Sequence, residues 1–340
     1  MGNKIIRSIC YFTQKPDDGV VLKIKEKKGL LEGHGFEVQT LRFCTSDLEF
    51  NEIVRRVNDK EIMLGASSVP CQNTSSQLKD FFRIPDDLSF NLDLTGSAIE
   101  AGHVDLLFEI IRNKPDRTFN FAYVFNNPLS SPYFPSANYG VEGFSIGLQS
   151  TDLTEGCRSL NEWFEKTTSV WDEINLIFKD DQEFLGIDSS VAPVFQGNSS
   201  LINWIKRLGM TFNESVLTDT YLKITKFIKE KNPKPIGLCG LMFPCLEDFE
   251  LADEYEQGNF SLERNLFLSL HSGLGVDTYP IGIDENPEKV INILKTVQGL
   301  SNKYHKPLSV RFVSDGKAKI GEKTDFKNQY LKDVIIRPLA

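Results

Sequence analysis

Apolar and polar positions along the chain follow two different repeats in turn. Short, mostly apolar or alternating runs predict strands, and longer stretches with apolar residues at every third or fourth position predict amphipathic helices. The expected strands are 4–12, 37–43, 62–67, 89–94, 119–125, 143–149, 184–191, 236–243 and 308–313. The expected helices are 18–31, 46–58, 99–112, 152–178, 201–208, 220–229 and one that starts at Pro287 and continues to Tyr304.

This alternation of strands and helices favours an α/β fold. Parallel strands need long crossover connections, which helices commonly supply, so the sheet is expected to be largely parallel. We find no linker rich in Gly, Ser or Pro, and therefore expect one α/β domain over residues 1–340. A closed barrel of mostly parallel strands with outer helices is the simplest packing, and a doubly wound open sheet is the alternative.

Composition narrows the classes of function. Hydrophobic residues make up 40% of the 340 residues, and 25 are Phe, which indicates a substantial core. The net charge of −9 argues against a nucleic-acid partner, because phosphate backbones attract Lys and Arg. The six cysteines form no CxxC pair, no run is apolar enough for a membrane span, and no secretion signal is evident. We expect a cytoplasmic protein with a small-molecule ligand, and a homo-oligomer is compatible with the sequence.

Candidate chemistry lies in loops that follow the expected strands, because α/β proteins place their sites at the carboxyl ends of strands. The loop at Asp188 and Ser189 combines a carboxylate with hydroxyl groups, which suits a polar substrate, although a turn or helix cap uses the same residues. The adjacent Glu247 and Asp248 suit Mg²⁺ or Ca²⁺, or a general base. The acidic first turn of a helix is the equally weighted alternative for this pair.

Two further loops contain glycines. Segment 271–278 brings Asp277 close to glycines that let a backbone approach a ligand. Segment 316–324 contains Lys317, Gly321 and Thr324 and nearly matches the phosphate-binding pattern GxxxxGK[ST], but Glu322 breaks the spacing and excludes that class of triphosphatase. This segment has two interpretations: an anion site ahead of an expected helix, and a flexible basic surface loop.

Several of these loops belong to an ordered series of strings. The series comprises Ser131-Pro132-Tyr133-Phe134-Pro135, segments 143–153, 186–193, 241–248 and 275–280, and Lys306-Pro307-Leu308 followed by Gly316-Lys317, Gly321, Thr324 and Phe326. The series resembles the family called domain of unknown function 711. The resemblance implies a barrel like that of pyruvate formate-lyase and anaerobic ribonucleotide reductase. It does not imply their chemistry, because the glycyl-radical string Arg-Val-x-Gly-Tyr is not present, and the nearest segment, 311–316, lacks it.

The leading hypothesis is a non-radical enzyme that acts on a small anionic metabolite. In this hypothesis Glu247 and Asp248 bind Mg²⁺ or Ca²⁺ or act as the base, with Asp277 as a further catalytic carboxylate. The expected substrate- or anion-binding residues are Asp188, Ser189, Ser150, Lys317, Gly321 and Thr324. The alternative is a non-catalytic protein that binds or senses a small molecule on the same fold. The sequence leaves the reaction open.

Overall fold

The computed structural model describes residues 3–57, 59–70, 74–84 and 88–339, with the backbone alone for 74–77. Its strands are β1 (Ile5–Phe12), β2 (Glu37–Val38), β3 (Leu41–Cys44), β4 (Ile62–Ser68), β5 (Leu88–Asp93), β6 (Phe121–Phe125), β7 (Gly143–Leu148), β8 (Phe184–Asp188), β9 (Gly275–Pro280) and β10 (Leu308–Val313). Its α-helices are α1 (Asp18–Gly33), α2 (Phe50–Arg56), α3 (Thr74–Phe81), α4 (Ala101–Asn113), α5 (Leu160–Ile177), α6 (Leu201–Arg207), α7 (Phe212–Ser215), α8 (Thr220–Lys231), α9 (Phe249–Glu256), α10 (Leu262–His271) and α11 (Pro287–Tyr304). The 3₁₀ helices of the described residues are η2 (Pro115–Asn120), η3 (Ser150–Thr154) and η4 (Gly197–Ser199).

The strands form one large mixed sheet in the order β8-β7-β1-β3-β4-β5-β6-β10-β9, with β2 beside β1. Strands β1 to β6 are parallel to one another, and so are the two strands in each of the pairs β7–β8 and β9–β10. The two antiparallel junctions are β1–β7 and β6–β10. Thus the second half of the chain runs opposite to the first half within the same sheet. The prediction of an α/β fold with a large, mostly parallel sheet is confirmed.

The two outer strands, β8 and β9, do not pair with each other. The segment 235–248 lies between them and forms isolated parallel bridges to both sides. It meets the β8 side at Ile187↔Pro235 and Val191↔Leu241, and the β9 side at Leu241↔Gly273 and Pro244↔Asp277. Hydrogen bonds between regular strands therefore do not close the sheet between β8 and β9.

The loop 126–142 lies against the inner face of the sheet. Phe134 packs over Gly65 of β4 and Tyr133 over Gly147 of β7, where an added Cβ would approach ring atoms to 2.7 and 2.8 Å. Asn91 of β5 donates hydrogen bonds to the loop carbonyls of Pro135 and Ala137, at 2.9 and 3.1 Å. The missing side chains of the two glycines therefore make room for the loop inside the fold.

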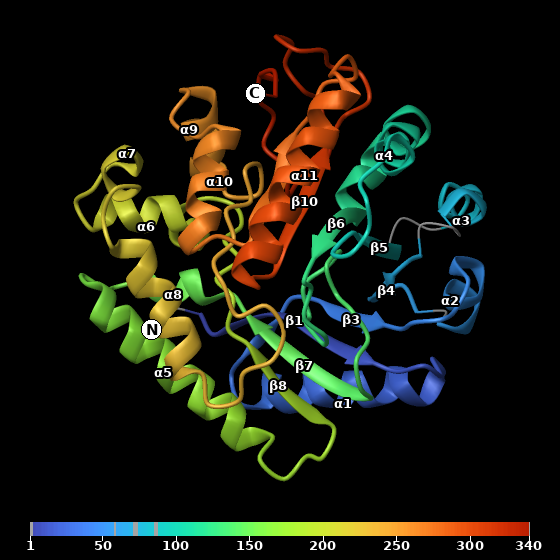
Figure 1. Ribbon diagram of the computed structural model, residues 1–340. Helices are drawn as coiled ribbons and strands as arrows, with labels where there is room; N and C mark the ends of the chain where they lie inside the picture. Colours follow the sequence, from blue (N-terminus) through green and yellow to red (C-terminus); the bar gives the residue numbers. More distant parts are fainter. Residues whose placement is uncertain (1–2, 58, 71–73, 85–87, 340) are drawn as a thin grey trace.

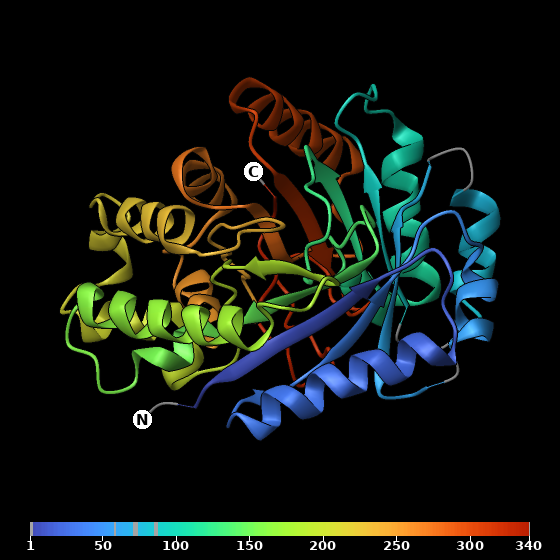
Figure 2. The ribbon, with the colours of Figure 1, turned by 90° about the horizontal axis from the view of Figure 1, so that it is seen from below.

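The helices surround the strands on the outside, as Figure 1 shows, and the view from below in Figure 2 shows α1 and α5 lying along the outer side of the sheet. Local signals fix their ends: the Asp17 side chain accepts from Val20 N at the start of α1, and α11 ends at His305, which has a left-handed φ of 47°. None of the described helices is long and apolar enough to cross a membrane.

Several elements differ from the sequence prediction. The helix expected over 152–178 is divided into η3 and α5, because Gly156 adopts a φ of +75° and Ser159 caps a new helix. The strand expected over 236–243 is irregular, with positive φ at Gly237 and Cys239. The expected strand 37–43 is two short strands, β2 and β3.

Other expected elements begin later or are missing. The helix expected over 46–58 begins only at Phe50, after the left-handed Asp47, and its expected last residue, 58, lies outside the described residues. No helix follows the segment 316–324 within the described residues, where the chain is irregular to residue 339. Described cysteines form no disulfide, and Cys71 lies outside the described residues.

Candidate functional site

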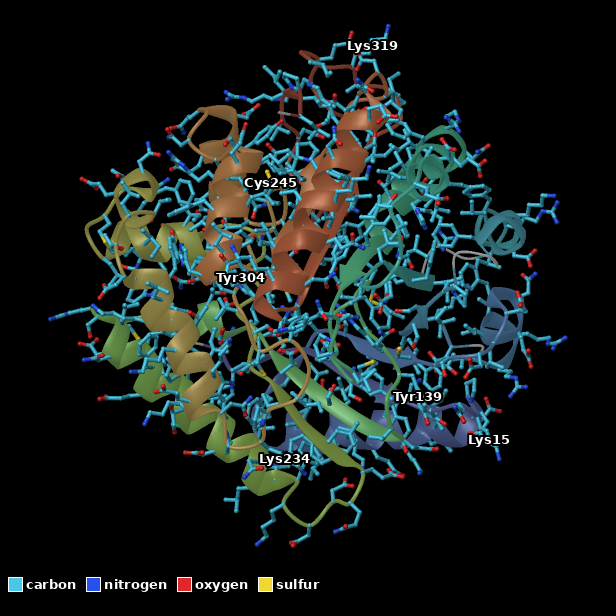
Figure 3. The ribbon with its side chains drawn as sticks, viewed as in Figure 1. Lys15, Tyr139, Lys234, Cys245, Tyr304 and Lys319 are labelled. Carbon is cyan, nitrogen blue, oxygen red and sulfur yellow. The ribbon has the colours of Figure 1, made fainter. Side chains whose placement is uncertain are left out.

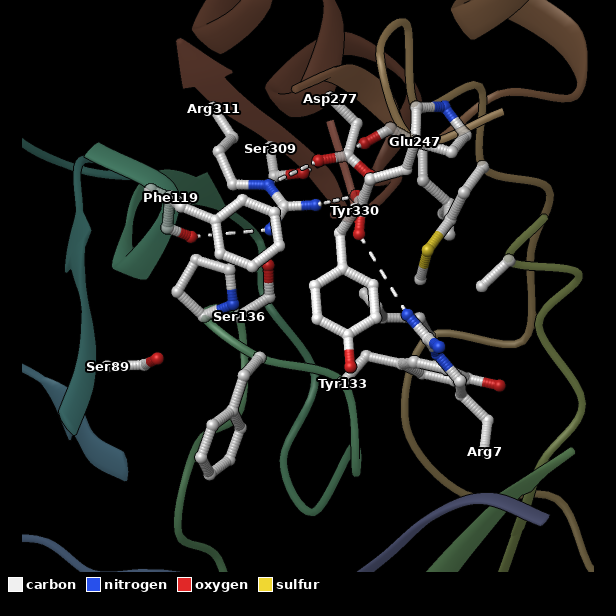
Figure 4. A pocket seen from close by; sticks show the side chains of 18 of the residues that line it. Arg7, Ser89, Phe119, Tyr133, Ser136, Glu247, Asp277, Ser309, Arg311 and Tyr330 are labelled. Atoms are coloured by element: carbon white, nitrogen blue, oxygen red, sulfur yellow. Dashed lines mark hydrogen bonds and ion pairs between the residues drawn. The ribbon is translucent and has the colours of Figure 1, made fainter. Parts of the chain in front are cut away.

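A cavity of about 110 Å³ lies between the loop 126–142 and the strands of both halves of the sheet. Five charged side chains of the described residues line it: Arg7 of β1, Arg42 of β3, Glu247, Asp277 of β9 and Arg311 of β10. Figure 4 shows several of them converging on one end of the cavity. The strand residues that line the cavity lie within the first three residues of β1, β3, β4, β5 and β6 and within the first four residues of β9 and β10.

Arg311 joins the two carboxylates of the cavity. Its Nε lies 2.6 Å from Asp277 Oδ1, and its Nη2 lies 2.5 Å from Glu247 Oε2. Its Nη1 donates to the Phe119 carbonyl at 3.4 Å, and its guanidinium lies over the Phe119 ring. All three nitrogens of this guanidinium therefore have partners, and the side chain holds both acids in place.

The other two arginines are less fully paired. Arg7 Nη2 lies 3.9 Å from Glu247 Oε1, beyond hydrogen-bonding distance, and Arg7 Nη1 donates to Gln39. Arg42 is buried and donates to the Thr40 hydroxyl and the Pro132 carbonyl. The ion pairs of the described residues are at most 4.0 Å long. None of them joins Arg42 to a carboxylate. Burial, followed by repulsion from Arg7, lowers the pKa of Arg42 to about 10.

Glu247 is the carboxyl group best placed for proton exchange. Burial raises its pKa above the ordinary glutamate value, and the positive charge of Arg311 opposes this rise. A buried carboxyl group with a raised pKa can hold or release a proton at a pH closer to neutrality than an exposed one can. Three arginines and two carboxylates line the cavity, which leaves an excess of positive charge there when all five are ionised.

Tyr330, from the irregular C-terminal segment, is an aromatic member of the cavity wall. Its ring stacks on Phe119 at a centroid distance of 6.4 Å and on Phe195 at 5.4 Å, and Arg7 lies 6.0 Å from its centroid. The segment that carries it is attached to the rest of the chain by the hydrogen bond from Lys332 N to the Leu246 carbonyl. Tyr330 therefore closes the cavity beside Glu247.

Glu247 and Asp248 are neighbours in sequence but face different surroundings. Asp248 is fully buried and caps α9 by accepting from Leu251 N, and it also accepts from the Ser200 hydroxyl and Leu201 N at the start of α6. The helix-cap alternative therefore describes Asp248, while Glu247 lies in the cavity with Asp277. Within the described ranges, no group of three or more His, Cys, Asp or Glu side chains is arranged to hold a metal ion. The Mg²⁺ or Ca²⁺ site at these two carboxylates stays a prediction.

Asp188, Ser189 and Ser150 are buried, but they do not line the cavity. Asp188 accepts five hydrogen bonds, from the Ser131 hydroxyl, the backbone amide and hydroxyl of Ser190, and the backbone amides of Leu238 and Cys239. It therefore ties β8 to the segment 235–248 and to the loop 126–142. The Ser189 hydroxyl donates to the Ile228 carbonyl, and the Ser150 carbonyl accepts from the Trp163 indole.

The residues of the expected anion loop do not line the cavity either. Lys317 and Gly321 are exposed, and the buried Thr324 donates its hydroxyl to Asp333. Figure 3 shows the neighbouring Lys319 at the outer edge of the molecule. Asp315 accepts from the amides of Lys317 and Ala318, so an internal carboxylate occupies the amides of this loop.

The three arginines were not predicted to be site residues. A signal was present, because each lies inside an apolar strand: Ile6-Arg7-Ser8-Ile9, Leu41-Arg42-Phe43 and Val310-Arg311-Phe312. Strands of a largely parallel sheet are covered on both faces, so a charged residue at their centre points to a polar interior site.

The comparisons with known proteins bear on the family alone. Curated proteins gave no match to this chain. The family model described as Uncharacterised ACR (DUF711) matches residues 89–328. The matched span contains Glu247, Asp277 and Arg311, whereas Arg7 and Arg42 precede it and Tyr330 follows it. Because the match covers more than half of the chain, the protein belongs to the Uncharacterised ACR (DUF711) family.

Proposed function

We propose that the protein is an enzyme that binds a small carboxylate or phosphate metabolite in the interior cavity and transfers a proton through Glu247. The observation that carries the proposal is Arg42, a buried guanidinium without a carboxylate partner in the described part of the chain. A buried charge is costly unless it is paired, so a cavity that retains such a cation is suited to an anion from outside. Arg7 supplies a second guanidinium for the same ligand.

The proton-transfer role rests on the surroundings of Glu247. Arg311 holds its carboxylate at 2.5 Å and fixes Asp277 on the other side of the same guanidinium. Burial raises the pKa of Glu247, so this group takes up a proton at a higher pH than an exposed glutamate does, which suits proton transfer. With the ligand anion at Arg7 and Arg42, Glu247 would face an adjacent atom of that ligand.

The closed barrel of the pyruvate formate-lyase type belongs to this proposal. It is supported by two groups of parallel strands that meet at two antiparallel junctions, and by the isolated bridges of segment 235–248 to both β8 and β9. Closure through this segment would enclose the cavity on all sides and keep water from the ligand.

The proposal is tested by a thermal-shift screen of small carboxylates and phosphates against the wild-type protein and Arg42→Gln. We expect the shifts to be lost in Arg42→Gln and retained in Arg56→Gln, whose guanidinium pairs with Glu52 on the surface of α2. A panel without any shift, or shifts that persist in Arg42→Gln, would overturn the anion site.

Catalysis is tested separately with Glu247→Gln. Compounds that pass the screen are incubated with each protein, and products are followed by nuclear magnetic resonance. We expect Glu247→Gln to bind these compounds without converting them. Conversion at the wild-type rate would refute the role of Glu247, and binding without conversion by the wild-type protein would favour the non-catalytic alternative.

A further inference from the structure

The cavity has a second polar end that the charged residues do not explain. Ser89 of β5 and Asn120, which directly precedes β6, both line it and are both buried, with exposed fractions of 3% and 7%. Figure 4 shows Ser89 on the opposite side of the cavity from Arg7. Asn120 Nδ2 donates to Ser89 Oγ at 3.1 Å, so the two side chains form one polar unit.

This unit retains one donor and one acceptor. The Ser89 hydroxyl accepts from Asn120, and no described residue accepts its proton. Likewise, no described donor makes a hydrogen bond to Asn120 Oδ1, and the residue borders the cavity. Buried polar groups are normally satisfied, so this end is suited to a ligand group that both donates and accepts.

The arrangement of strands places an apolar surface between the two polar ends. Arg42 of β3 is paired in register with Met63 of β4, and β4 is followed by β5 with Ser89. Adjacent strands are about 4.8 Å apart, so β3 and β5 are separated by roughly 10 Å. Met63, Ala122 and Phe134 supply apolar lining to the same cavity, and the lining residues contributed by β4, β5 and β6 carry no charge.

We infer that Ser89 and Asn120 form a second subsite, and that the ligand is an elongated carboxylate with an apolar middle and a neutral hydrogen-bonding group, such as a carboxamide, at its far end. This inference rests on the proposed function, because Arg7 and Arg42 are taken to hold the carboxylate. A second carboxylate at the far end is disfavoured, since it would be buried beside Ser89 and Asn120 without a cation.

Three para-substituted benzoates test the inference: benzoate, 4-carbamoylbenzoate and terephthalate. They share a carboxylate and a flat apolar ring and differ at the far end, which is a hydrogen, a carboxamide or a second carboxylate. Isothermal titration calorimetry of the wild-type protein should give the lowest Kd for 4-carbamoylbenzoate, roughly tenfold below that of benzoate, and the highest Kd for terephthalate.

Two variants assign the difference to the subsite. Ser89→Ala and Asn120→Ala should each raise the Kd of 4-carbamoylbenzoate severalfold and leave that of benzoate unchanged. Ser145→Ala is the matched control, because Ser145, like Ser89, is a buried strand serine, but its hydroxyl has no partner among the described residues and it does not line the cavity.

The outcomes separate this inference from the proposed function. Equal Kd values for the three benzoates, or a preference that survives both variants, would overturn the second subsite and leave the anion site standing. No binding of any benzoate would also overturn the inference, and the anion site would then be judged by its own screen with Arg42→Gln.

Discussion

Replacing Arg311 with Met should strongly destabilise the protein at neutral pH. Arg311 makes ion pairs of 2.5 and 2.6 Å to Glu247 and Asp277, and its side chain and that of Glu247 are each only 8% exposed. Removing the shared partner leaves two carboxylates in the cavity wall without it, and breaking a buried ion pair in this way costs about 3–5 kcal/mol. In contrast, Arg56→Met breaks a pair between half-exposed side chains on α2 and should cost less than about 0.5 kcal/mol.

The loss should depend on pH in a defined direction. Burial raises the pKa of Glu247, and Arg311 is the largest opposing influence, so the pKa rises further in Arg311→Met. A carboxyl group whose pKa is higher in the folded state than in the unfolded state stabilises the fold at low pH and loses that contribution as the pH rises through its folded value. The destabilisation should therefore be smaller at pH 5.5 than at pH 8.

Urea unfolding at both pH values measures the effect, with the fluorescence of the buried Trp163, Trp171 and Trp204 as the signal. A loss below about 1 kcal/mol at pH 8 would refute the reasoning that the pair is costly to break. Equal losses of unfolding free energy at the two pH values would refute the prediction that the pKa of Glu247 rises in Arg311→Met.

Three further predictions concern residues other than the five charged residues that line the cavity. Gly275→Ala should lower the free energy of unfolding by at least about 3 kcal/mol, because Gly275 has a φ of +108° and an added Cβ would lie 2.1 Å from the Ser309 carbonyl oxygen. In the same urea series, Gly29→Ala in α1, where the space is open, should raise it by about 0.5–1 kcal/mol, and similar effects of both changes would contradict this explanation. Asp188→Ala should cost about 3 kcal/mol or more, because the amides of Leu238 and Cys239 lose their buried acceptor, and a cost near that of the exposed Asp93→Ala would argue against this role. Burial raises the pKa of Asp248 to about 7, so its contribution to stability is full below about pH 4 and is lost as the pH rises to 7. Asp248→Asn keeps a residue that caps helices well, and it should make the free energy of unfolding depend less on pH in this window. An unchanged pH dependence would contradict the raised pKa of Asp248.

Much of the fold was predictable because it depends on local patterns. Strands such as β10 and helices such as α11 follow directly from apolar runs and from an apolar stripe after Pro287. The prediction was wrong where one residue changes the backbone direction, as Gly156 and Ser159 do ahead of α5. Periodicity alone cannot detect such a break, since apolar residues continue on both sides of it.

The site was only partly predictable for a different reason. Glu247 and Asp277 were selected because they follow apolar segments, and the structure places both in the cavity. Asp248 has the same sequence context as Glu247, but its backbone position at the start of α9 turns its side chain towards amides. Whether Arg7 and Arg42 line the cavity depends on which face of each strand points to the interior. That orientation is determined by strand pairing between distant parts of the chain.

Because Tyr330 lines the cavity, ligand binding would restrict the motion of the C-terminal segment as well as that of the strands. The cavity wall includes Arg7 in the first strand and Tyr330 in the irregular segment after the last strand. A ligand that contacts both would hold the first and last parts of the chain together, so local opening at either would require its release. Ligand binding should then slow amide hydrogen exchange in β1 and in the segment around Tyr330 at the same time, although the two are more than 300 residues apart in sequence.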